Sequence, residues 1–477
     1  MPEADTGTSL VHHLEHAAAT WPDRSAWTFE DAAGSTTTLT FAHVGEQSAA
    51  LAATLAGLGV VPGDRVAVMI GNRPEFPLLW LALMRLGAAI VPLNVRYRSS
   101  DAAHVVADSA PRLAVCAAEH MTLLAPLVET HDVADLVALE SGPWVPERGS
   151  LDPASVVNVQ YTSGTTGPPK GCLLSHRYWT TLGRSMLTEF PNIAHDDVLL
   201  TAQPFHYIDP QWNVVTALMA GAHLVVLDGF HPSTFWDRVR AHGVTYFYCL
   251  ASMPTLLLKM PAEPADREHH VRAVQCSAIP PSRHADLEER WGVGWYEAFG
   301  MTETGADIRV SAAEHDELVG SGCLGRPAGH REARVVDGQL WLRGDGMMDG
   351  YLGHPDPFDA EGWFPTGDLA RFDDSGRIYL QGRLKDMIRR SGENIAAHEV
   401  EEVLAGHPAV RLAAVVGVPD EVRGEEVKAY VVAPGASPAE LEAWCAERLA
   451  SFKVPRLWEF RDDLPLTASH RVEKAKL

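Results

Sequence analysis

Short hydrophobic runs alternate with longer, helix-like stretches along most of this chain. Val66–Ile70 and Ala88–Leu93 have the length of buried strands, and the helix-like stretch Phe76–Leu86 lies between them. Runs of similar length recur at Leu113–Cys116, Val156–Gln160, Val198–Thr201, His223–Leu227 and Thr245–Cys249. Strands separated by helices are typical of parallel α/β units. The pattern therefore predicts a large N-terminal α/β domain of layered sheets and helices.

The C-terminal part of the chain has a different order of elements. Its periodicity predicts a helix, two strands and a second helix, at Ala396–Leu404, Leu412–Val418, Lys428–Val432 and Pro438–Leu449. This order is typical of a small α+β domain. The polar segment Gly382–Asp386 follows the predicted strand Ile378–Leu380 and suits a hinge. We expect an N-terminal domain over residues 1–382, a hinge at 383–386 and a mobile C-terminal α+β domain over 387–477.

Composition and charge narrow the class of protein. The 477 residues are enough for two or more domains. The net charge of −23 argues against nonspecific binding to nucleic acid or to an anionic membrane. The six cysteines lack metal or redox spacing, and Met1–Leu10 lacks the apolar region of a secretory signal. We expect a cytoplasmic protein that binds neither nucleic acid nor membrane.

A loop rich in glycine and hydroxyl groups directly follows the predicted strand Val156–Gln160. Exposed backbone N–H groups, hydroxyls and one ammonium suit a polyphosphate, and open α/β sheets bind ligands where strands end. The loop lacks the Walker pattern, because Lys170 is neither preceded by glycine nor followed by Ser or Thr. We predict an ATP site here, with the candidate ligands Thr162, Ser163, Gly164, Thr165, Thr166, Gly167 and Lys170.

Several motifs in register carry a family resemblance. With the loop Tyr161–Gly171, the stretches Tyr296–Gly305, Thr366–Leu369, Gly382–Asp386 and Ser391–Ile395 resemble the signature motifs of the adenylate-forming superfamily. That superfamily includes acyl-CoA ligases, peptide-synthetase adenylation domains and luciferases. The resemblance spans nearly the whole chain, and Arg389–Ile395 is most similar to the carnitine/crotonobetaine-type CoA ligases. It implies ATP-dependent adenylation of a small carboxylic acid, with Mg²⁺, and transfer to a thiol, most simply coenzyme A.

The resemblance also implies a role for individual residues. Glu303 would bind Mg²⁺, which prefers hard oxygen ligands, and Thr302 would lie beside the phosphates. Asp368 would accept the ribose hydroxyls, and Arg383 would contact ribose or phosphate. Lys385 would be the pivot of domain rotation. The remaining implied nucleotide contacts are Ala298, Phe299 and Gly300, and the implied coenzyme A-facing loop contains Arg390, Ser391, Gly392 and Glu393.

The stretch Pro204–Tyr207 resembles the motif that gates the acyl pocket in the family. His206 would shield the carboxylate or move between the half-reactions. Further pocket residues are expected beside the motifs: Tyr207, Asp209, Trp212, Tyr248, Ser277, Ala278, Gly305 and Asp307. Asp209 and Asp307 would suit an acid that bears an ammonium group, whereas the aromatic residues would suit an aryl or alkenyl acid. The identity of the acid stays open.

One position departs from the family pattern. The family usually ends with Pro-x-Thr-x-x-Gly-Lys, whose lysine bridges the substrate carboxylate and ATP. Here His470 stands at the glycine and Arg471 at the lysine. Arginine can stabilise a carboxylate and a phosphate, with a planar fork in place of a point charge. We expect Arg471 to act in adenylation; Lys474 or Lys476 would need a shifted register.

The departure keeps other functions open. A related enzyme can load a carrier protein, form an amide, or activate nitrite to diazotise an aryl amine. No carrier-protein module follows, which favours a stand-alone ligase, as a monomer or a homodimer. A non-catalytic nucleotide-binding protein is disfavoured because Lys170, Glu303, Asp368 and Arg383 are all present.

Overall fold

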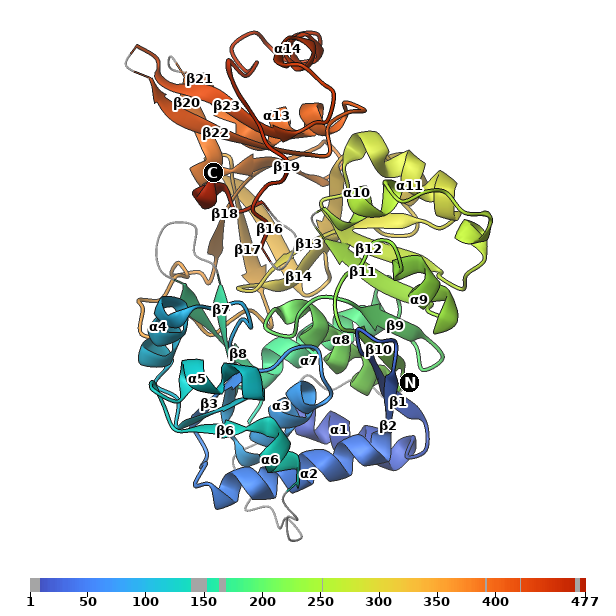
Figure 1. Cartoon of the computed structure of the whole chain (residues 1–477), viewed down its shortest axis with the longest axis vertical. Helices are drawn as coiled ribbons and strands as arrows, with labels where there is room; N and C mark the ends of the chain where they lie inside the picture. Colours follow the sequence, from blue (N-terminus) through green and yellow to red (C-terminus); the bar gives the residue numbers. More distant parts are fainter. Residues whose placement is uncertain are drawn as a thin grey trace.

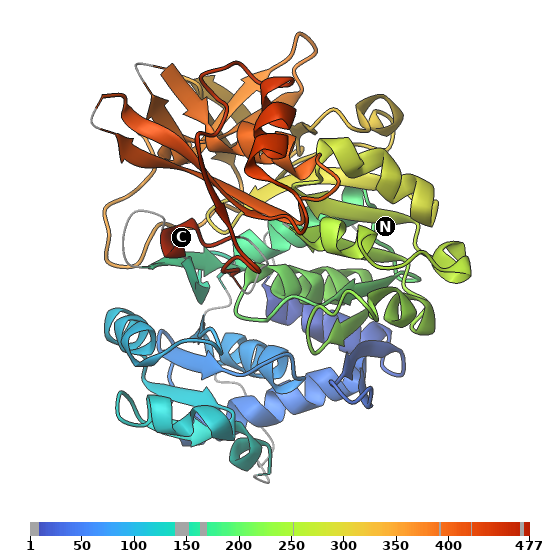
Figure 2. The same ribbon diagram turned by 45° about the horizontal axis from the view of Figure 1, so that its top comes forward.

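Three sheets organise the residues that the computed structural model describes, which are 9–138, 152–162, 169–250, 252–390, 393–420, 422–467 and 472–477. Figure 1 shows the N-terminal layer at the bottom, a second and larger layer above it, and the C-terminal module at the top. The turned view in Figure 2 shows the same stacking of the blue, green and orange-red parts. The expected class, a large layered α/β part plus a smaller C-terminal part, is confirmed.

The N-terminal sheet contains the predicted parallel units. Its order is β6-β5-β3-β4-β7-β8, and only the β7–β8 pair is antiparallel. Its strands are β3 (Arg65–Met69), β4 (Ala89–Pro92), β5 (Leu113–Cys116), β6 (Thr130–Asp132), β7 (Val156–Thr162) and β8 (Lys170–Ser175). Its associated helices are α1 (Leu10–Thr20), α2 (Phe41–Gly57), α3 (Glu75–Leu86), α4 (Ser99–Ser109), α5 (Met121–Leu124) and α6 (Val133–Ala138). Helix α3 lies in the chain between β3 and β4, as the periodicity predicts.

The larger sheet joins a parallel half to an antiparallel half. Among the described residues its order is β16-β17-β18-β19-β15-β14-β13-β12-β11-β9-β10-β1-β2. The parallel half contains β1 (Ser25–Glu30), β9 (Val198–Thr201), β10 (His223–Leu227), β11 (Tyr246–Leu250), β12 (Ala273–Ser277) and β13 (Trp295–Met301), with β2 (Thr36–Thr40) antiparallel at its edge. The antiparallel half contains β14 (Gly305–Arg309), β15 (Cys323–Pro327), β16 (Arg331–Val336), β17 (Gln339–Gly344), β18 (Phe364–Phe372) and β19 (Ile378–Arg383).

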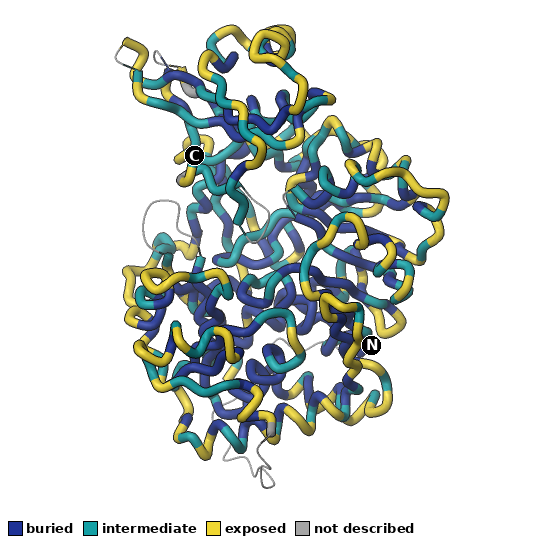
Figure 3. Tube along the Cα trace, viewed as in Figure 1, coloured by how far each residue is buried: buried dark blue, intermediate teal, exposed yellow. Residues whose placement is uncertain are grey.

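Helices connect and cover these strands. Helix α7 (His176–Thr188) contacts β8 of the first sheet and β14 of the second, and α8 (Ile208–Ala220) packs on α7, β9 and β10. The remaining helices of this part are α9 (Phe235–Ala241), α10 (Met253–Leu258), α11 (His284–Trp291) and α12 (His315–Leu318). Figure 3 shows that buried residues concentrate along the strands and on the inner faces of the helices. The antiparallel half of the sheet was not foreseen.

The C-terminal module packs around a hydrophobic cluster of its own. Its strands are β20 (Met387–Arg390), β21 (Glu393–Ala396), β22 (Leu412–Asp420), β23 (Gly424–Val432) and β24 (Leu457–Phe460), and its helices are α13 (Ala397–Ala405) and α14 (Pro438–Ala446). Ile388, Val400 and Val427 are buried in that cluster. Helix α14 begins in a capping box, since Ser437 Oγ accepts from the backbone N–H of Glu440 at 3.3 Å. The short helix Leu384–Asp386 joins this module to β19.

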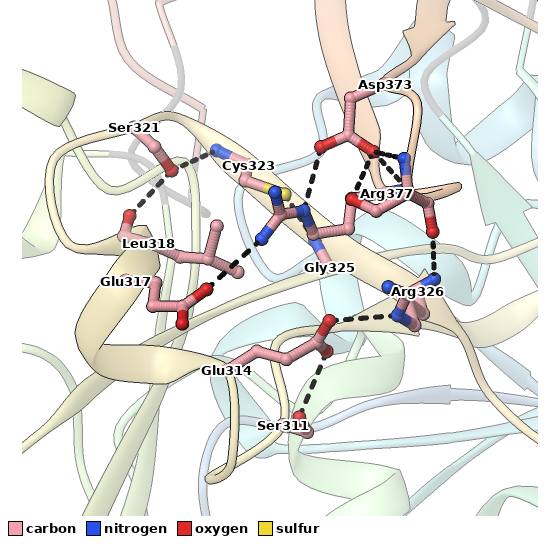
Figure 4. A network of polar contacts seen from close by, with 11 residues as sticks. Ser311, Glu314, Glu317, Leu318, Ser321, Cys323, Gly325, Arg326, Asp373 and Arg377 are labelled. Atoms are coloured by element: carbon pink, nitrogen blue, oxygen red, sulfur yellow. Dashed lines mark hydrogen bonds and ion pairs between the residues drawn. The ribbon is translucent and has the colours of Figure 1, made fainter.

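The turn between β18 and β19 is fixed by a polar network. Asp373 Oδ1 accepts from the backbone N–H groups of Ser375 and Arg377, both at 2.9 Å, and Asp373 Oδ2 accepts from Arg377 Nε at 2.8 Å. Arg326 donates to the Ser375 carbonyl at 2.6 Å and to Glu314 Oε1 at 2.9 Å (Figure 4). This network holds together β18, which carries Asp368 in its middle, and β19, which ends at Arg383.

Candidate active site

The base of the phosphate loop is an antiparallel hairpin. Thr162 ends β7 and pairs in register with Lys170, which begins β8. Helix α4 holds both sides, because Tyr161 donates to Asp108 Oδ2 at 2.5 Å and His104 Nε2 lies 3.0 Å from the Pro169 carbonyl. The structure therefore fixes the loop's two ends. The other candidate ligands, Ser163, Gly164, Thr165, Thr166 and Gly167, lie outside the described residues.

Tyr351, a residue that the sequence analysis missed, lies between Glu303 and this hairpin. Tyr351 donates to Glu303 Oε1 at 3.0 Å, and Lys170 Nζ lies 5.3 Å from the centroid of the Tyr351 ring. The Glu303 carbonyl also accepts from the Met348 N–H at 2.9 Å. No sequence spacing links Tyr351 to Glu303, because 48 residues separate them. The fold brings the predicted phosphate lysine and the predicted metal ligand to one place.

The carboxylate of Glu303 fits a Mg²⁺ ligand. Glu303 is 9% exposed, and this burial is the main cause of its raised pKa. The hydrogen bond from Tyr351 and the charge of Arg383 act in the opposite direction and lower the pKa. A bound divalent cation would offset the cost of this buried negative charge. The hard oxygen donors of a carboxylate are those that Mg²⁺ prefers. Thr302 precedes Glu303 in the turn after β13, whose residues Ala298, Phe299 and Gly300 lead into it.

Asp368 and Arg383 face each other across β18 and β19. They are register partners, and the guanidinium donates to both carboxylate oxygens, from Nε to Oδ1 at 2.8 Å and from Nη2 to Oδ2 at 3.3 Å. The charges of both residues affect the pKa of Glu303, so all three lie in one region. A carboxylate oxygen can accept more than one hydrogen bond, so Asp368 has the chemistry expected of a ribose ligand while it is paired with Arg383.

His206 lies on a loop that is tied to the phosphate-loop strand. Gln160 on β7 donates to the His206 carbonyl at 2.6 Å, and Gln211 on α8 donates to the Phe205 carbonyl at 2.8 Å. Gln211 also donates to Gln160 Oε1 at 3.1 Å and accepts from Asn158 at 2.7 Å. These buried amides join β7 to the loop that carries His206, and the sequence analysis did not identify them. The His206 ring packs on Tyr207, with centroids 4.6 Å apart.

The pH profile of activity should show no titration of His206. Burial, and secondarily the nearby charge of Arg96, lowers the pKa of His206 to about 3. Since this folded-state pKa lies below the ordinary value, the ring is neutral throughout the range from about pH 5 to pH 8. We expect His206→Asn to change the rate of acid-dependent pyrophosphate release without changing the shape of its pH profile. A titration near pH 6.5 that disappears in the variant contradicts this assignment.

Several of the expected acyl-pocket residues form a chain of contacts that reaches Ala298, one of the implied nucleotide contacts. Trp212 packs edge-on against Tyr248, with centroids 5.6 Å apart, and the Tyr248 hydroxyl lies 2.5 Å from Ser277 Oγ. Ser277 in turn donates to the carbonyl of Ala298 on β13. Ala278 has a φ of +70°, in the left-handed region. Strained backbone of this kind is often found at functional sites.

The other expected pocket residues differ in what they can offer to a substrate. Gly305 begins β14 with a φ of +91°, and its Cα region faces the Tyr178 ring. Asp209 lies in the first turn of α8. The carboxylate of Asp307 is fully buried and engaged by Arg331 Nε at 2.7 Å and by the Thr304 hydroxyl. We therefore leave Asp307 out of the pocket that we propose, because its charge is already paired inside the core.

The C-terminal module contains the remaining candidates. Arg390 is buried and donates to both oxygens of Glu426, at 2.6 and 3.1 Å, so its guanidinium is paired inside the module. Glu393 is exposed at the start of β21. Lys385 lies in the helix that joins the module to β19, and burial lowers its pKa. Ser391, Gly392 and Arg471 lie outside the described residues.

The two lysines that could replace Arg471 are both paired within the module. Lys474 Nζ lies 2.8 Å from Glu401 Oε1 and 3.6 Å from Asp386 Oδ2, and Lys476 Nζ lies 2.5 Å from Glu473 Oε2. Moving either ammonium to a substrate would first break these ion pairs. Lys474 therefore has partners of its own, whereas the exposed Lys476 pair holds its ammonium only weakly. The assignment of adenylation to Arg471 stays a prediction.

One histidine–carboxylate cluster lies among the described residues, formed by His284, Glu288 and His315. Both ring nitrogens of His284 are hydrogen bonded, Nε2 to the Trp295 carbonyl at 2.7 Å and Nδ1 to the Gly320 N–H at 3.2 Å. A ring nitrogen that donates its proton to a carbonyl is not a metal ligand. Hydrogen bonding around α11 therefore accounts for the cluster, and we do not assign it as a metal site.

Comparison with known proteins decides the family. The model of the AMP-binding enzyme family matches residues 14–352, and that of the AMP-binding enzyme C-terminal domain matches residues 399–471. The chain belongs to the AMP-binding enzyme family. This result confirms the resemblance to adenylate-forming enzymes, and the match covers both the sheet-rich body and the C-terminal module.

Similar proteins extend over the whole length of this AMP-binding enzyme. It is 29% identical to the crotonobetaine/carnitine–CoA ligase of Salmonella agona (strain SL483), over 99% of both chains. It is 27% identical to an o-succinylbenzoate CoA synthetase from Bacillus subtilis in complex with an acyl-adenylate intermediate, with a TM-score of 0.88 over 97% of both chains. An ATP-bound MatB from Rhodopseudomonas palustris is 26% identical, with a TM-score of 0.86 over 98% of both chains.

No helix in the described part of the chain combines the length and the apolar character that crossing a membrane requires.

Proposed function

We propose that this protein is an ATP-dependent, AMP-forming acid–CoA ligase that activates a small carboxylic acid. The observation that carries the proposal is the meeting of Lys170, Glu303, Asp368 and Arg383 in one region, from motifs that are distant in sequence. Relatives that match over nearly the full length include a crotonobetaine/carnitine–CoA ligase and an o-succinylbenzoate CoA synthetase. One relative has been solved with ATP and a magnesium ion, which supports the same cofactors here.

In the first half-reaction, a carboxylate oxygen of the acid attacks the α-phosphorus of ATP. The new oxygen–phosphorus bond forms as the bond to the β-phosphate breaks, and pyrophosphate leaves. We assign Lys170 and the Thr162 end of the loop to the departing phosphates, and Asp368 to the ribose. Mg²⁺ bound by Glu303 would neutralise phosphate charge. Positioning and charge neutralisation supply most of the rate in such a reaction.

In the second half-reaction, the thiol of coenzyme A loses its proton and attacks the acyl carbonyl, and AMP leaves with the oxygen that joined it to the acyl group. We propose that the module over residues 387–477 turns about the hinge at 383–386, with Lys385 as the pivot. The turn would replace Arg471 in the site by the loop at Gly392. Such rearrangements let one site serve two steps.

The proposed pocket contains His206, Trp212, Tyr248 and Ser277, with Tyr207, Asp209, Ala278 and Gly305 around them. Its aromatic rings, and the paired hydroxyls of Tyr248 and Ser277, suit an unsaturated or aryl acid.

The test is pyrophosphate release across a panel of small acids, with and without coenzyme A. We expect at least one acid to give release that coenzyme A accelerates, with AMP and an acyl thioester as products. The same panel includes nitrite with aryl amines. Release that depends on nitrite and an amine, and that is indifferent to coenzyme A, would replace the CoA-ligase proposal by diazotisation.

Arg471→Ala should separate the half-reactions. If Arg471 bridges the carboxylate and ATP, the variant slows adenylation by roughly 10²-fold or more and leaves the thiolysis of supplied acyl-AMP close to the wild-type rate. Single-turnover assays of each half-reaction measure the two rates. Lys476→Ala is the control, because its ammonium is already paired with Glu473. Equal losses in both half-reactions, or none, remove Arg471 from this role.

A further inference from the structure

Tyr351 lies between two predicted phosphate-handling residues that belong to different parts of the fold. Its hydroxyl donates to Glu303 Oε1 at 3.0 Å, and its ring lies under the ammonium of Lys170, 5.3 Å from nitrogen to centroid. Glu303 comes from the turn between β13 and β14 of the large sheet, whereas Lys170 begins β8 of the N-terminal sheet. One tyrosine thus contacts both sides of the site.

The backbone around Tyr351 is fixed on both of these sides. Tyr351 forms a β-bridge with Cys172, and the Leu352 N–H donates to the Gly171 carbonyl at 2.8 Å. Three residues before Tyr351, the Met348 N–H donates to the Glu303 carbonyl at 2.9 Å. The segment therefore joins β8 to the Glu303 turn through main-chain bonds, which fix the position of the Tyr351 backbone relative to both.

The contact with Glu303 selects an orientation of its carboxylate. Glu303 is 9% exposed, so its side chain depends on protein partners. The Tyr351 hydroxyl and the backbone N–H of Glu303 itself use two of about four acceptor positions of the carboxylate and leave the rest for a cation. A residue that hydrogen bonds to a metal ligand orients that ligand. Removing such a residue typically lowers metal affinity 10- to 100-fold.

We infer that Tyr351 is a positioning residue that orients Glu303 for Mg²⁺ and couples this carboxylate to Lys170. The inference rests on the proposed function, because it takes the Mg²⁺ of MgATP as the cation. The hydroxyl fixes the metal ligand, and the ring supports the lysine through a cation–π contact. Tyr351 keeps the metal ligand and the phosphate lysine in register before ATP binds.

The test compares Tyr351→Phe with the wild type in metal binding without turnover. The probe is Mn²⁺ with α,β-methylene-ATP, followed by electron paramagnetic resonance, because this nucleotide cannot be cleaved at the bond that adenylation breaks. We expect the variant to bind Mn²⁺ about 10-fold more weakly and to need a similarly higher Mg²⁺ concentration for pyrophosphate release. The KM for the acid should stay unchanged. Tyr351→Leu, which also removes the ring, should weaken nucleotide binding further.

Two further variants give the test its controls. Tyr246→Phe also removes a buried hydroxyl, one that donates to Gln275 at 2.7 Å within the core, and should leave Mn²⁺ binding unchanged. In a Glu303→Gln background, Tyr351→Phe should add no further loss, because the hydroxyl acts through Glu303. Additive losses, or wild-type Mn²⁺ binding by Tyr351→Phe, overturn the inference. A wild-type protein that binds no Mn²⁺–nucleotide overturns the proposed function itself.

Discussion

Replacing Glu303 by glutamine lowers acid-dependent pyrophosphate release by roughly 10²–10³-fold, the usual cost of removing one group that stabilises transition-state charge. The amide keeps the size and one acceptor oxygen, so the hydrogen bond from Tyr351 can remain. It cannot supply the negative charge that attracts Mg²⁺. The loss should therefore shrink as the Mg²⁺ concentration rises, which steady-state assays over a Mg²⁺ series will measure.

The same substitution should leave stability intact. Because burial raises the pKa of Glu303, its folded state disfavours the charged form, and a neutral amide removes that cost. The midpoint of urea unfolding should be unchanged or higher. Glu332→Gln is the matched control, since its carboxylate is exposed and pairs with Arg343 on the neighbouring strand. A stable Glu303→Gln protein with wild-type activity and Mg²⁺ dependence contradicts the metal assignment.

Arg331→Met should produce the largest loss of stability of any substitution considered. The side chains of Arg331 and Asp307 are 1% and 0% exposed, and they form an ion pair at 2.7 Å. Arg331 also donates to the carbonyls of Thr304 and Asp345, at 2.6 and 3.0 Å. Removing one partner of a buried pair leaves the other uncompensated and costs about 3–5 kcal/mol. Urea unfolding at about pH 7 measures this change.

The loss should depend on pH in a defined direction. Burial raises the pKa of Asp307 to about 6, although Arg331 acts against the rise. In Arg331→Met this opposing charge is gone, so the pKa of Asp307 rises further. Because the folded state then binds the proton more readily than the unfolded state, stability is lost as pH rises and is recovered as pH falls. The difference from wild type should shrink from about pH 7 to pH 5.

Two variants check the cause of that loss. Asp307→Asn in the Arg331→Met background should restore part of the stability, because it removes the unpaired charge. Arg343→Met, at an exposed ion pair on the neighbouring strand β17, should change the unfolding midpoint little. A loss in Arg331→Met that is independent of pH and unaffected by Asp307→Asn would show that packing, and not charge, explains it.

The hydrophobic periodicity of short sequence windows predicted several strands and helices, some of them with their observed bounds. The runs at Leu113–Cys116, Val198–Thr201 and His223–Leu227 are strands with those bounds. The strand predicted at Lys428–Val432 begins earlier, at Gly424, because the long antiparallel partner β22 extends its pairing. The predicted helix from Pro438 ends at Ala446, three residues early. Such differences follow from tertiary pairing, which a short sequence window does not contain.

The motifs predicted which residue types gather in the site, but not what holds them. Asp368 and Arg383 were both expected to contact the nucleotide, and their register pairing follows from a hairpin that no periodicity indicated. Tyr351, Gln160 and Gln211 were missed because each acts on a partner that is distant in sequence. Asp307 was expected in the pocket because it follows a motif, whereas its partner Arg331 comes from another strand.

Transfer of oxygen-18 from the acid to AMP tests the central claim most directly. An acid that supports turnover is labelled in its carboxylate and converted in the presence of ATP, Mg²⁺ and coenzyme A, and the AMP is analysed by mass spectrometry. Activation through an acyl-AMP predicts one labelled oxygen in each AMP and the other in the thioester. Thioester formation with unlabelled AMP would contradict the account, because the carboxylate oxygen would then never have bonded to the α-phosphorus.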